Sequence, residues 1–261
     1  MKLLIKIGGT LVDERASRLR VAGGIAEAVR AGHRVVVVHG GGRQMTRFLE
    51  ERGVESRFID GLRVTTDETL DAVLKVLAGT VNKQLVSALI ESGVNAAGIS
   101  GIDGSLVEAE PLRAELGHVG RPVRSRPELL HCLGEAGFVP VVACVAGGRD
   151  GRMFNVNADQ MAVACAIGFQ PERLVFLTDV DGVLDADKRP IDHLSLEASQ
   201  DLIDRGVATG GMLAKLRAAG EALRNGIPQV VIAPGGRDGV LSRLLAGDPV
   251  GTRLYREQDH G

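Results

Sequence analysis

Short runs of apolar, mostly β-branched residues recur along this chain, separated by longer amphipathic stretches. A continuous apolar run is typical of a strand buried on both faces, and an amphipathic stretch between two such runs predicts a crossover helix. The alternation therefore predicts an α/β fold: a three-layer sandwich with a mainly parallel central sheet flanked by helices. The expected strands are Leu3–Ile7, Val35–Val38, Ala96–Ile99, Val139–Val145, Leu174–Leu177 and Val230–Ala233. The expected helices are Ser17–Arg30, Gln44–Arg52, Asp67–Ser92 with an interruption near Gly79, Pro127–Glu135, Asn157–Ile167 and Gly210–Asn225.

Two segments break this alternation. Glu55–Val64 and Ser105–Arg124 contain short alternating stretches rich in glycine and charge, which predict hairpins laid over the sheet edge. Two helix starts resemble capping boxes, namely Thr65 with Glu68 and Asn157 with Gln160. The 261 residues show no repeat and no clear linker, so we expect one domain with a functional division near residue 154.

Composition narrows the class of function. Thirty-one Lys and Arg against 33 Asp and Glu exclude the basic excess that nucleic-acid or anionic-membrane binding usually needs. Aromatic residues are only 3%, so stacking platforms for bases are scarce, and a small-molecule protein is expected. Cys132, Cys144 and Cys165 lie in apolar contexts and predict reduced core thiols. With no signal-peptide pattern and no apolar run long enough for a bilayer, the expected location is the cytoplasm.

Two early strands end in glycines, in a fold class where ligands bind beyond the carboxyl ends of the strands. The first reads Lys6-Ile7-Gly8-Gly9 and the second His39-Gly40-Gly41-Gly42. Such loops expose consecutive backbone N–H groups that suit phosphate or carboxylate oxygens, although glycines also serve simple tight turns. The P-loop and G-x-G-x-x-G patterns are both missing, which disfavours a P-loop NTPase and an ordinary dinucleotide dehydrogenase.

Lysine is rare here, with only six among the basic residues. Lys6 stands inside an apolar strand, where a buried ammonium needs an anionic partner. Lys215 lies one turn into the helix that begins at Gly210, so its ammonium can reach the helix start, although an exposed helix residue is the ordinary alternative. Asp159 could hold both lysines, or could merely favour the dipole of its helix, and Asn155 is expected at the loop mouth.

Three further positions have weaker signals. Arg63 stands among apolar residues in the first hairpin, and arginine suits a bidentate grip on a carboxylate. The segment from Thr178 to Val183 ends a strand in a turn that could line a nucleotide pocket or bind Mg²⁺, or be a turn alone. His39 is expected to be a hydrogen-bonding strand-end residue rather than a base. No nucleophile pattern emerges from the sequence.

Taken together, these motifs resemble the amino acid kinase family, and within it the branch that acts on N-acetyl-L-glutamate. The resemblance runs in order from Lys2 to about Leu254. It is based on the two glycine loops and on Gly61–Thr65, Ala78–Lys83, Glu115–Gly120, Asn155–Gln160, Thr178–Leu184 and Gly211-Met212-x-x-Lys215.

The resemblance implies direct phosphoryl transfer from ATP, carrying Mg²⁺, to the side-chain carboxylate of N-acetyl-L-glutamate, in arginine biosynthesis. A carboxylate is already ionised at neutral pH, which agrees with the lack of a catalytic base pattern. By the matching motifs, Lys6 and Lys215 would stabilise charge on the transferring phosphoryl group, and Asp159 would organise both lysines.

The same resemblance implies which residues bind each ligand. The N-terminal lobe, about residues 1–154, would bind the acyl substrate and dimerise, and the C-terminal lobe, about residues 155–261, would bind the nucleotide. Mg²⁺ would be carried by ATP without protein ligands. The residues implied for the acyl substrate are Gly41, Gly42, Arg63 and Asn155. Those implied for ATP are Gly8, Gly9, Thr178, Asp179, Val180, Gly182, Leu184, Val207, Thr209 and Gly211.

Departures from the family pattern keep alternatives open. Arg43 and the segment Cys144–Arg149 do not match the acetylglutamate branch, so a kinase for an aminoadipate-type or carrier-linked acidic substrate remains an alternative. A catalytically silent amino-acid or nucleotide sensor is another, which the retention of both lysines and Asp159 disfavours. Arginine-inhibited members carry an extra N-terminal helix, whereas the first strand begins at residue 2 here. We therefore expect a homodimer that is insensitive to arginine.

Overall fold

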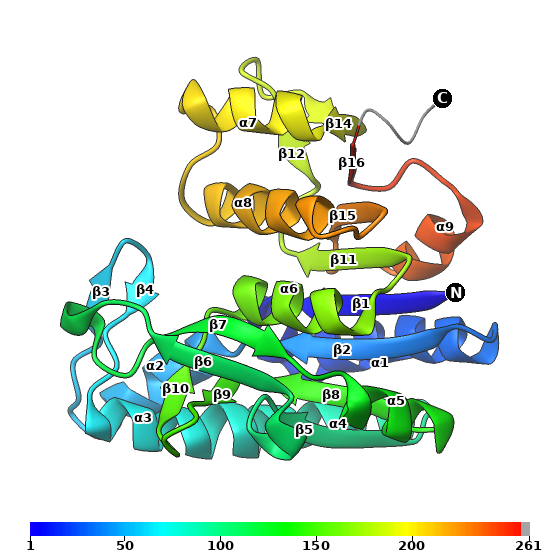
Figure 1. Ribbon diagram of the computed structural model, residues 1–261. Coiled ribbons are helices and arrows are strands. Elements are labelled where there is room, and N and C mark those ends of the chain that lie inside the picture. The colour runs from blue at the N-terminus through cyan, green and yellow to red at the C-terminus, as the bar shows by residue number, and fades with distance from the viewer. Residues whose placement is uncertain (257–261) are drawn as a thin grey trace.

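An eight-stranded sheet forms the centre of the computed structural model, which describes residues 1–256 (Figure 1). Its strand order is β14-β16-β15-β11-β1-β2-β8-β5. Neighbouring strands are parallel except β15 and β16, which confirms the mainly parallel sheet. The strands are β1 (Lys2–Ile7), β2 (Arg34–His39), β5 (Ala96–Ser100), β8 (Val139–Ala143), β11 (Arg173–Thr178), β14 (His193–Ser195), β15 (Gln229–Pro234) and β16 (Thr252–Tyr255).

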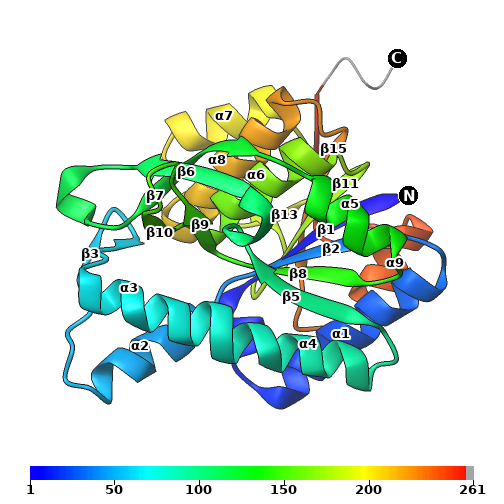
Figure 2. The same cartoon turned by 60° about the horizontal axis from the view of Figure 1, so that its bottom comes forward.

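Helices cover both faces of this sheet and complete the expected three layers (Figures 1 and 2). One face carries α1 (Arg15–Arg30), α2 (Gly42–Glu50), the continuous helix of α3 (Asp67–Val73), η2 (Leu74–Val81) and α4 (Asn82–Glu91), and α9 (Val240–Ala246). The other carries α5 (Glu128–Glu135), α6 (Ala158–Phe169), α7 (Leu196–Asp204) and α8 (Gly210–Arg224).

The alternation of side chains along β1 separates these two cores. Leu3, Ile5 and Ile7 pack in the core under α1, while Leu4 packs in the core under α6. Because successive side chains of a strand point to opposite faces, Lys6 shares the α6 face with Leu4. The strand pattern thus aims the one charged residue within β1's apolar run at the start of α6.

The two expected hairpins are present. The first is β3 (Phe58–Ile59) with β4 (Leu62–Arg63). The second, β6 (Val107–Pro111) with β7 (Gly120–Ser125), does not lie over the edge of the central sheet. It joins β9 (Val145–Gly147) and β10 (Met153–Asn155) in a separate four-stranded sheet, and β7 packs on α6. A third hairpin pairs β12 (Val183–Leu184) with β13 (Pro190–Ile191).

Three local expectations were wrong. The run Val139–Val145 is two strands of different sheets, because the chain leaves β8 at Cys144 and enters β9. The interruption near Gly79 is not a break, since the helix continues through it in π conformation. The cap of α3 is Thr66, whose hydroxyl accepts from the Thr69 amide, and not Thr65. Asn157 does cap α6, its side chain accepting from the amides of residues 159 and 160.

The continuous helix Asp67–Glu91 is long and apolar enough, by length and composition, to cross a membrane. Its buried side chains, however, belong to the core beneath the central sheet. Figure 2 shows it lying alongside α1 and α2 as part of one layer. We interpret it as a core helix.

Candidate active site

The two glycine loops meet at the carboxyl edge of the sheet. Their strands β1 and β2 are neighbours, and the Gly40 amide donates to the Ile7 carbonyl at 3.2 Å. The loop backbones approach so closely that a Cβ on Gly9 would lie 3.2 Å from the Gly42 nitrogen. The Gly8 amide is tied back to the Leu177 carbonyl at 2.8 Å. Side chains are therefore excluded between the loops, which brings backbone groups of both to one place.

Two lysines and one aspartate form a buried cluster beside these loops. Lys6 Nζ lies 2.7 Å from Asp159 Oδ1, and Lys215 Nζ lies 3.8 Å from Asp159 Oδ2. The side chains of Lys6 and Asp159 are 7% and 8% exposed, and that of Lys215 is 15% exposed. The structure thus brings together the three residues that were singled out far apart in the sequence, and we call them the Lys6–Asp159–Lys215 triad.

The charge of this triad indicates the kind of ligand it can take. Two ammonium groups and one carboxylate leave one positive charge in excess within a largely buried cluster. An uncompensated charge removed from water costs several kcal/mol, so the site favours an incoming anion. The ammonium of Lys215 is the looser of the two, because it is farther from the carboxylate and more exposed.

The starts of two helices hold the triad in place. Asn157 caps α6, accepting from the Asp159 amide at 2.9 Å, and this fixes Asp159 in the first turn. Lys215 lies in α8, whose N-cap residue Thr209 makes no side-chain capping bond. The ammonium of Lys215 reaches back toward the helix start, so that a Cβ on Gly211 would lie 3.9 Å from it. Free backbone donors at a helix start add partial positive charge, so they favour the same kind of ligand.

Arg63 projects from the hairpin β3–β4 toward the second glycine loop. Its guanidinium donates to the Thr46 hydroxyl at 2.7 Å and to the Gly42 carbonyl at 3.4 Å, as well as to the Ser56 hydroxyl. Burial lowers the pKa of this guanidinium from its ordinary value, and the charge of Glu50 opposes that shift. Among the ion pairs of the described residues, none contains Arg63. A half-buried arginine that makes no ion pair fits the carboxylate of a ligand.

One pocket contains all four residues expected at the acyl substrate. Its wall includes Gly41, Gly42, Arg63 and Asn155, together with apolar side chains such as Leu77. Asn155 donates through its amide to the Thr65 hydroxyl at 3.1 Å, which leaves its carbonyl oxygen without a partner among the contacts of the described chain. The pocket thus combines a cation, an amide and backbone groups with an apolar wall, as small-molecule sites usually do.

The residues expected around ATP lie on the other side of the triad. Thr178 is buried at the end of β11, beside the first glycine loop, where a Cβ on Gly8 would lie 3.7 Å from its Cα. Val180 and Leu184 are exposed apolar side chains, each 43% accessible, on the turn and short strand that follow. Asp179 and Gly182 lie in the same turn, with Gly182 packed on Thr252, and Val207 and Thr209 precede α8. Exposed apolar residues here suit a flat aromatic ring.

His39 is a strand-end residue that is fully hydrogen-bonded, as expected. Its Nδ1 lies 2.9 Å from the Gly40 carbonyl and its Nε2 lies 3.1 Å from the Asn82 amide nitrogen. Complete burial lowers its pKa to about 4, so it is neutral at pH 7. Burial likewise raises the pKa of the Cys144 thiol to about 12, in agreement with a protonated core thiol. Cys165 is buried too, but Cys132 is exposed and is not a core residue.

Several residues of the site were not predicted from sequence. Thr46 and Ser56 hold Arg63, and Thr65 holds Asn155. Their signals are weak because serines and threonines occur throughout surface segments, and only the fold shows which of them face a ligand pocket. Asn82 belongs to a segment that the family resemblance marked, but no role was attached to it.

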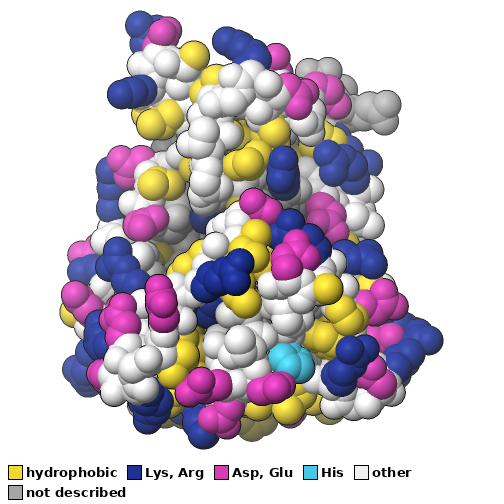
Figure 3. All heavy atoms as spheres, turned by 90° about the vertical axis from the view of Figure 1, so that its left-hand side faces the viewer, with side chains coloured by type: hydrophobic (Ala, Val, Ile, Leu, Met, Phe, Trp, Pro, Cys, Tyr) yellow, Lys and Arg dark blue, Asp and Glu magenta, His cyan; other side chains and the backbone are white. Residues whose placement is uncertain are grey.

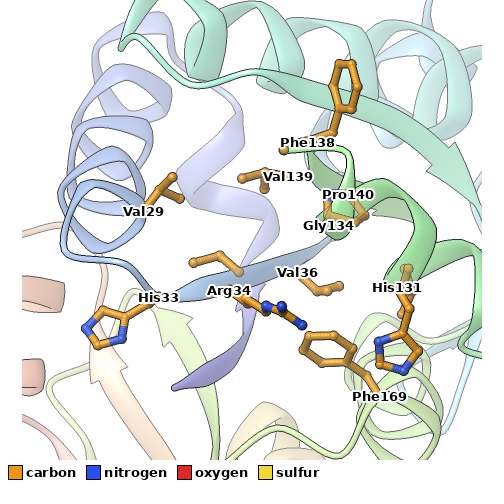
Figure 4. Close-up of a pocket in the computed structure, with 13 residues that line it drawn as sticks. Val29, His33, Arg34, Val36, His131, Gly134, Phe138, Val139, Pro140 and Phe169 are labelled. Atoms are coloured by element: carbon orange, nitrogen blue, oxygen red, sulfur yellow. The ribbon is translucent and has the colours of Figure 1, made fainter.

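Figure 3 faces this carboxyl edge and shows a hollow between the upper and lower parts of the molecule. A different pocket lies at the opposite edge, where β2 and β8 begin (Figure 4). Its wall is mainly apolar and includes Val36, Phe138 and Phe169, with Arg34 and His131 among its polar residues. None of the residues expected at the site lines this pocket.

Comparison with known proteins shows the family to which this chain belongs. The chain belongs to the amino acid kinase family, whose profile matches residues 1–233. It is 59% identical to the acetylglutamate kinase of Solibacter usitatus (strain Ellin6076), covering 97% of this chain and 99% of that protein. It is 46% identical to the acetylglutamate kinase of Rubrobacter xylanophilus, covering 98% and 97%.

Solved structures share the fold. N-acetylglutamate synthase from Neisseria gonorrhoeae, complexed with coenzyme A and N-acetyl-glutamate, superposes with a TM-score of 0.87 at 26% identity. The match covers 98% of this chain but only 59% of the synthase chain. Carbamate kinase from Giardia lamblia, bound to AMP-PNP, has a TM-score of 0.74 at 16% identity, which shows a shared fold alone.

Proposed function

We propose that this protein acts as an acetylglutamate kinase, which transfers the γ-phosphoryl group of ATP to the side-chain carboxylate of N-acetyl-L-glutamate. The observation that carries this proposal is the buried Lys6–Asp159–Lys215 triad, with its excess positive charge, between two glycine loops. The high identity to acetylglutamate kinases over almost the full chain supports the choice of substrate.

The reaction needs positioning and charge stabilisation rather than proton transfer. A carboxylate oxygen of the substrate attacks the γ-phosphorus, the bond to the bridging oxygen breaks, and ADP leaves with that electron pair. Lys6 and Lys215 would stabilise the charge that builds on the phosphoryl oxygens, while Asp159 keeps the two ammonium groups apart and in place. The neutral, buried His39 is not required as a base.

The acyl substrate would occupy the pocket beside the second glycine loop. Arg63 would hold its α-carboxylate, since this guanidinium is hydrogen-bonded to hydroxyl groups and makes no ion pair among the described residues. Asn155 would accept the acetamido N–H through its free carbonyl oxygen, and Gly41 and Gly42 would offer backbone groups near the reacting carboxylate. The side-chain carboxylate would then point toward the triad.

ATP would enter from the side of β11 and α8. Gly8, Gly9 and Gly211 would supply donors to the phosphates, and the adenine and ribose would lie along Thr178, Asp179, Val180, Gly182, Leu184, Val207 and Thr209. Mg²⁺ would be held by the nucleotide phosphates. When bound, Mg²⁺ neutralises part of the phosphate charge.

This assignment divides the chain between the ligands. Residues 1–154 would serve the acyl substrate and the contact between two protomers, and residues 155–261 the nucleotide. We further propose a homodimer that works in the cytoplasm.

The test is ATP-dependent formation of an acyl phosphate, trapped as its hydroxamate. N-acetyl-L-glutamate, free L-glutamate and N-acetyl-aminoadipate are offered side by side at equal concentration, with the Lys215→Ala variant as the control for background hydrolysis. We expect a strong preference for N-acetyl-L-glutamate. Preference for the aminoadipate derivative would change the assigned substrate, and ATP binding without any product would favour a carrier-linked substrate or a silent sensor.

A further inference from the structure

The helix Asp67–Glu91 lies directly against the second glycine loop, although none of its polar residues has a role in the reaction above. A Cβ on Gly41 would lie 2.7 Å from Leu77 Cδ2 and 3.1 Å from Val81 Cγ2. Both side chains are buried in the core beneath the sheet. The loop backbone therefore has no room to move toward this helix.

Asn82 follows this apolar contact and is completely buried. Its amide nitrogen donates to His39 Nε2 at 3.1 Å and to the Val141 carbonyl at 2.9 Å, and its oxygen accepts from Lys83 Nζ at 3.1 Å. The side chain fits only because Gly98 has no Cβ, which would otherwise lie 1.9 Å from the Asn82 oxygen. All three of these bonds keep the amide in one orientation, with its N–H groups toward β2 and β8.

The orientation of Asn82 decides the tautomer of His39. An amide nitrogen can only donate, so His39 Nε2 must accept, and the ring hydrogen must be on Nδ1. Nδ1 then donates to the Gly40 carbonyl, 2.9 Å away. On the other side of the same residue, the Gly40 amide donates to the Ile7 carbonyl. Both peptide groups that flank Gly40 are therefore held by bonds to buried partners.

We propose that Asn82 and His39 are positioning residues, forming a buried relay from the helix Asp67–Glu91 that sets the orientation of the Gly40–Gly42 loop for phosphoryl transfer. The inference rests on the proposed function, because that function assigns to this loop the backbone groups near the reacting carboxylate of the acyl substrate. Glycines alone would leave the loop free to sample many conformations. A misplacement of about 1 Å at a reacting centre can cost on the order of 100-fold in rate.

The kinetic test compares four single variants, and the double variant Asn82→Ala/His39→Ala, with the wild type. Asn82→Ala and His39→Ala break the relay at its two members. His39→Asn restores a donor near the position of Nδ1, which can again bond to the Gly40 carbonyl. Leu89→Ala is the matched control, because Leu89 is equally buried on the same helix but lies in its last turn, away from Asn82.

We expect both relay variants to lower kcat by about 10- to 100-fold, with KM for both substrates changed by less than about 3-fold. His39→Asn should recover at least about 10-fold of the kcat lost in His39→Ala. The double variant should be little worse than either single one, because both substitutions break the same relay. Leu89→Ala should lower Tm without this loss of kcat. Equal kcat losses in Leu89→Ala, or kcat within 2-fold of wild type in His39→Ala, would overturn the proposal.

A second measurement separates this proposal from the assigned reaction. Amide hydrogen exchange of the ligand-free protein reports on the Gly40 amide, bonded to Ile7, and on the Met45 amide, bonded to Gly41. We expect exchange at both to rise at least about 10-fold in Asn82→Ala and His39→Ala, but not in Leu89→Ala. If no acceptor is phosphorylated but exchange rises as expected, only the proposed function fails. Unchanged exchange in both relay variants rejects the relay itself.

Discussion

The two lysines of the triad differ in how they are held. Lys6, in a buried strand, makes a short ion pair with Asp159. Lys215 projects from α8, and its ammonium lies 3.8 Å from the same carboxylate. Because Lys6 is fixed by its strand and by Asp159, its positive charge stays in one place. A looser ammonium suits a charge that follows the phosphoryl group as it moves between oxygens.

Replacement of Lys215 tests this distinction. We expect Lys215→Ala to lower kcat by at least about 100-fold, with KM for both substrates within about 3-fold, because its charge matters most in the transition state. Arg217→Ala, which removes an exposed cation two residues further along α8, is the control. Steady-state kinetics decide the matter, and an unchanged kcat in Lys215→Ala would remove this residue from the mechanism.

Arg63 should act on binding rather than on turnover. Arg63→Ala removes a charged hydrogen-bond donor worth about 1.5–3 kcal/mol, so KM for the acyl substrate should rise about 10- to 100-fold. KM for ATP should stay constant. The control is Arg57→Ala, which replaces an exposed residue next to the same hairpin and should leave KM for both the acyl substrate and ATP unchanged. An effect confined to ATP would mean that Arg63 lies at the wrong end of the site.

Among the helices and strands, the sequence predicted best the strands that are buried on both faces of the central sheet. Five of the six expected strands exist as single strands, and the sixth, Val139–Val145, divides into β8 and β9. Strands such as β1 and β11 were predicted because they pack helices on each face and so read as continuous apolar runs. The short strands β14 and β16 and the helices α7 and α9 were not predicted, since they lie near one end of the sheet and have mixed patterns. The switch of sheets at Cys144 left no signal, because both strands are buried.

The residues of the candidate site were likewise predicted best where they stand out from an apolar run. Lys6 and Asp159 were found because a charge inside or beside an apolar run is exceptional, and the fold then shows that Lys215 reaches the same place. The relay from Asn82 to His39 was not predicted, because it depends on the π-helical segment and on the space left by Gly98. Such a fit is a property of three-dimensional packing and leaves no pattern in the sequence.

The close approach of the helix to the glycine loop gives a prediction at this scale. Gly41→Ala should destabilise the protein by about 1–3 kcal/mol, because the new methyl group overlaps Leu77 and Val81. It should also lower kcat by moving the loop. Urea unfolding and steady-state kinetics measure both effects, and a stable, fully active variant would show that the helix is not pressed on the loop.

A second glycine shows the opposite case. Gly23 lies within α1, and a Cβ there would meet nothing within 4 Å. Gly23→Ala should therefore raise the free energy of unfolding by about 0.5–1 kcal/mol through higher helix propensity, and leave kcat unchanged. A loss of stability in urea unfolding would mean that this face of α1 is already covered by another protein surface.

For the molecule as a whole, the buried imidazole predicts a stability that falls in acid. The pKa of His39 is lowered to about 4, so between that value and 6.5 the unfolded chain binds a proton that the folded protein does not. Stability is therefore lost as pH falls through this range, by about 2 kcal/mol between pH 7 and pH 5. Urea unfolding at both pH values measures the loss of stability. In His39→Asn, which lacks the imidazole, the loss between pH 7 and pH 5 should be smaller by about 2 kcal/mol. Equal pH dependence in the variant would contradict the prediction.

The position of β1 at the centre of the sheet also determines when the protein can fold during synthesis. This first strand pairs with β2, made soon afterwards, and with β11, which ends only at Thr178. Until β11 leaves the ribosome, one edge of β1 is unpaired, and Lys6 has no ion pair until α6 supplies Asp159. Pairing between segments so distant in sequence is slow and exposes strand edges. The nascent chain of this protein thus keeps one edge of β1 open to wrong pairing for most of its translation.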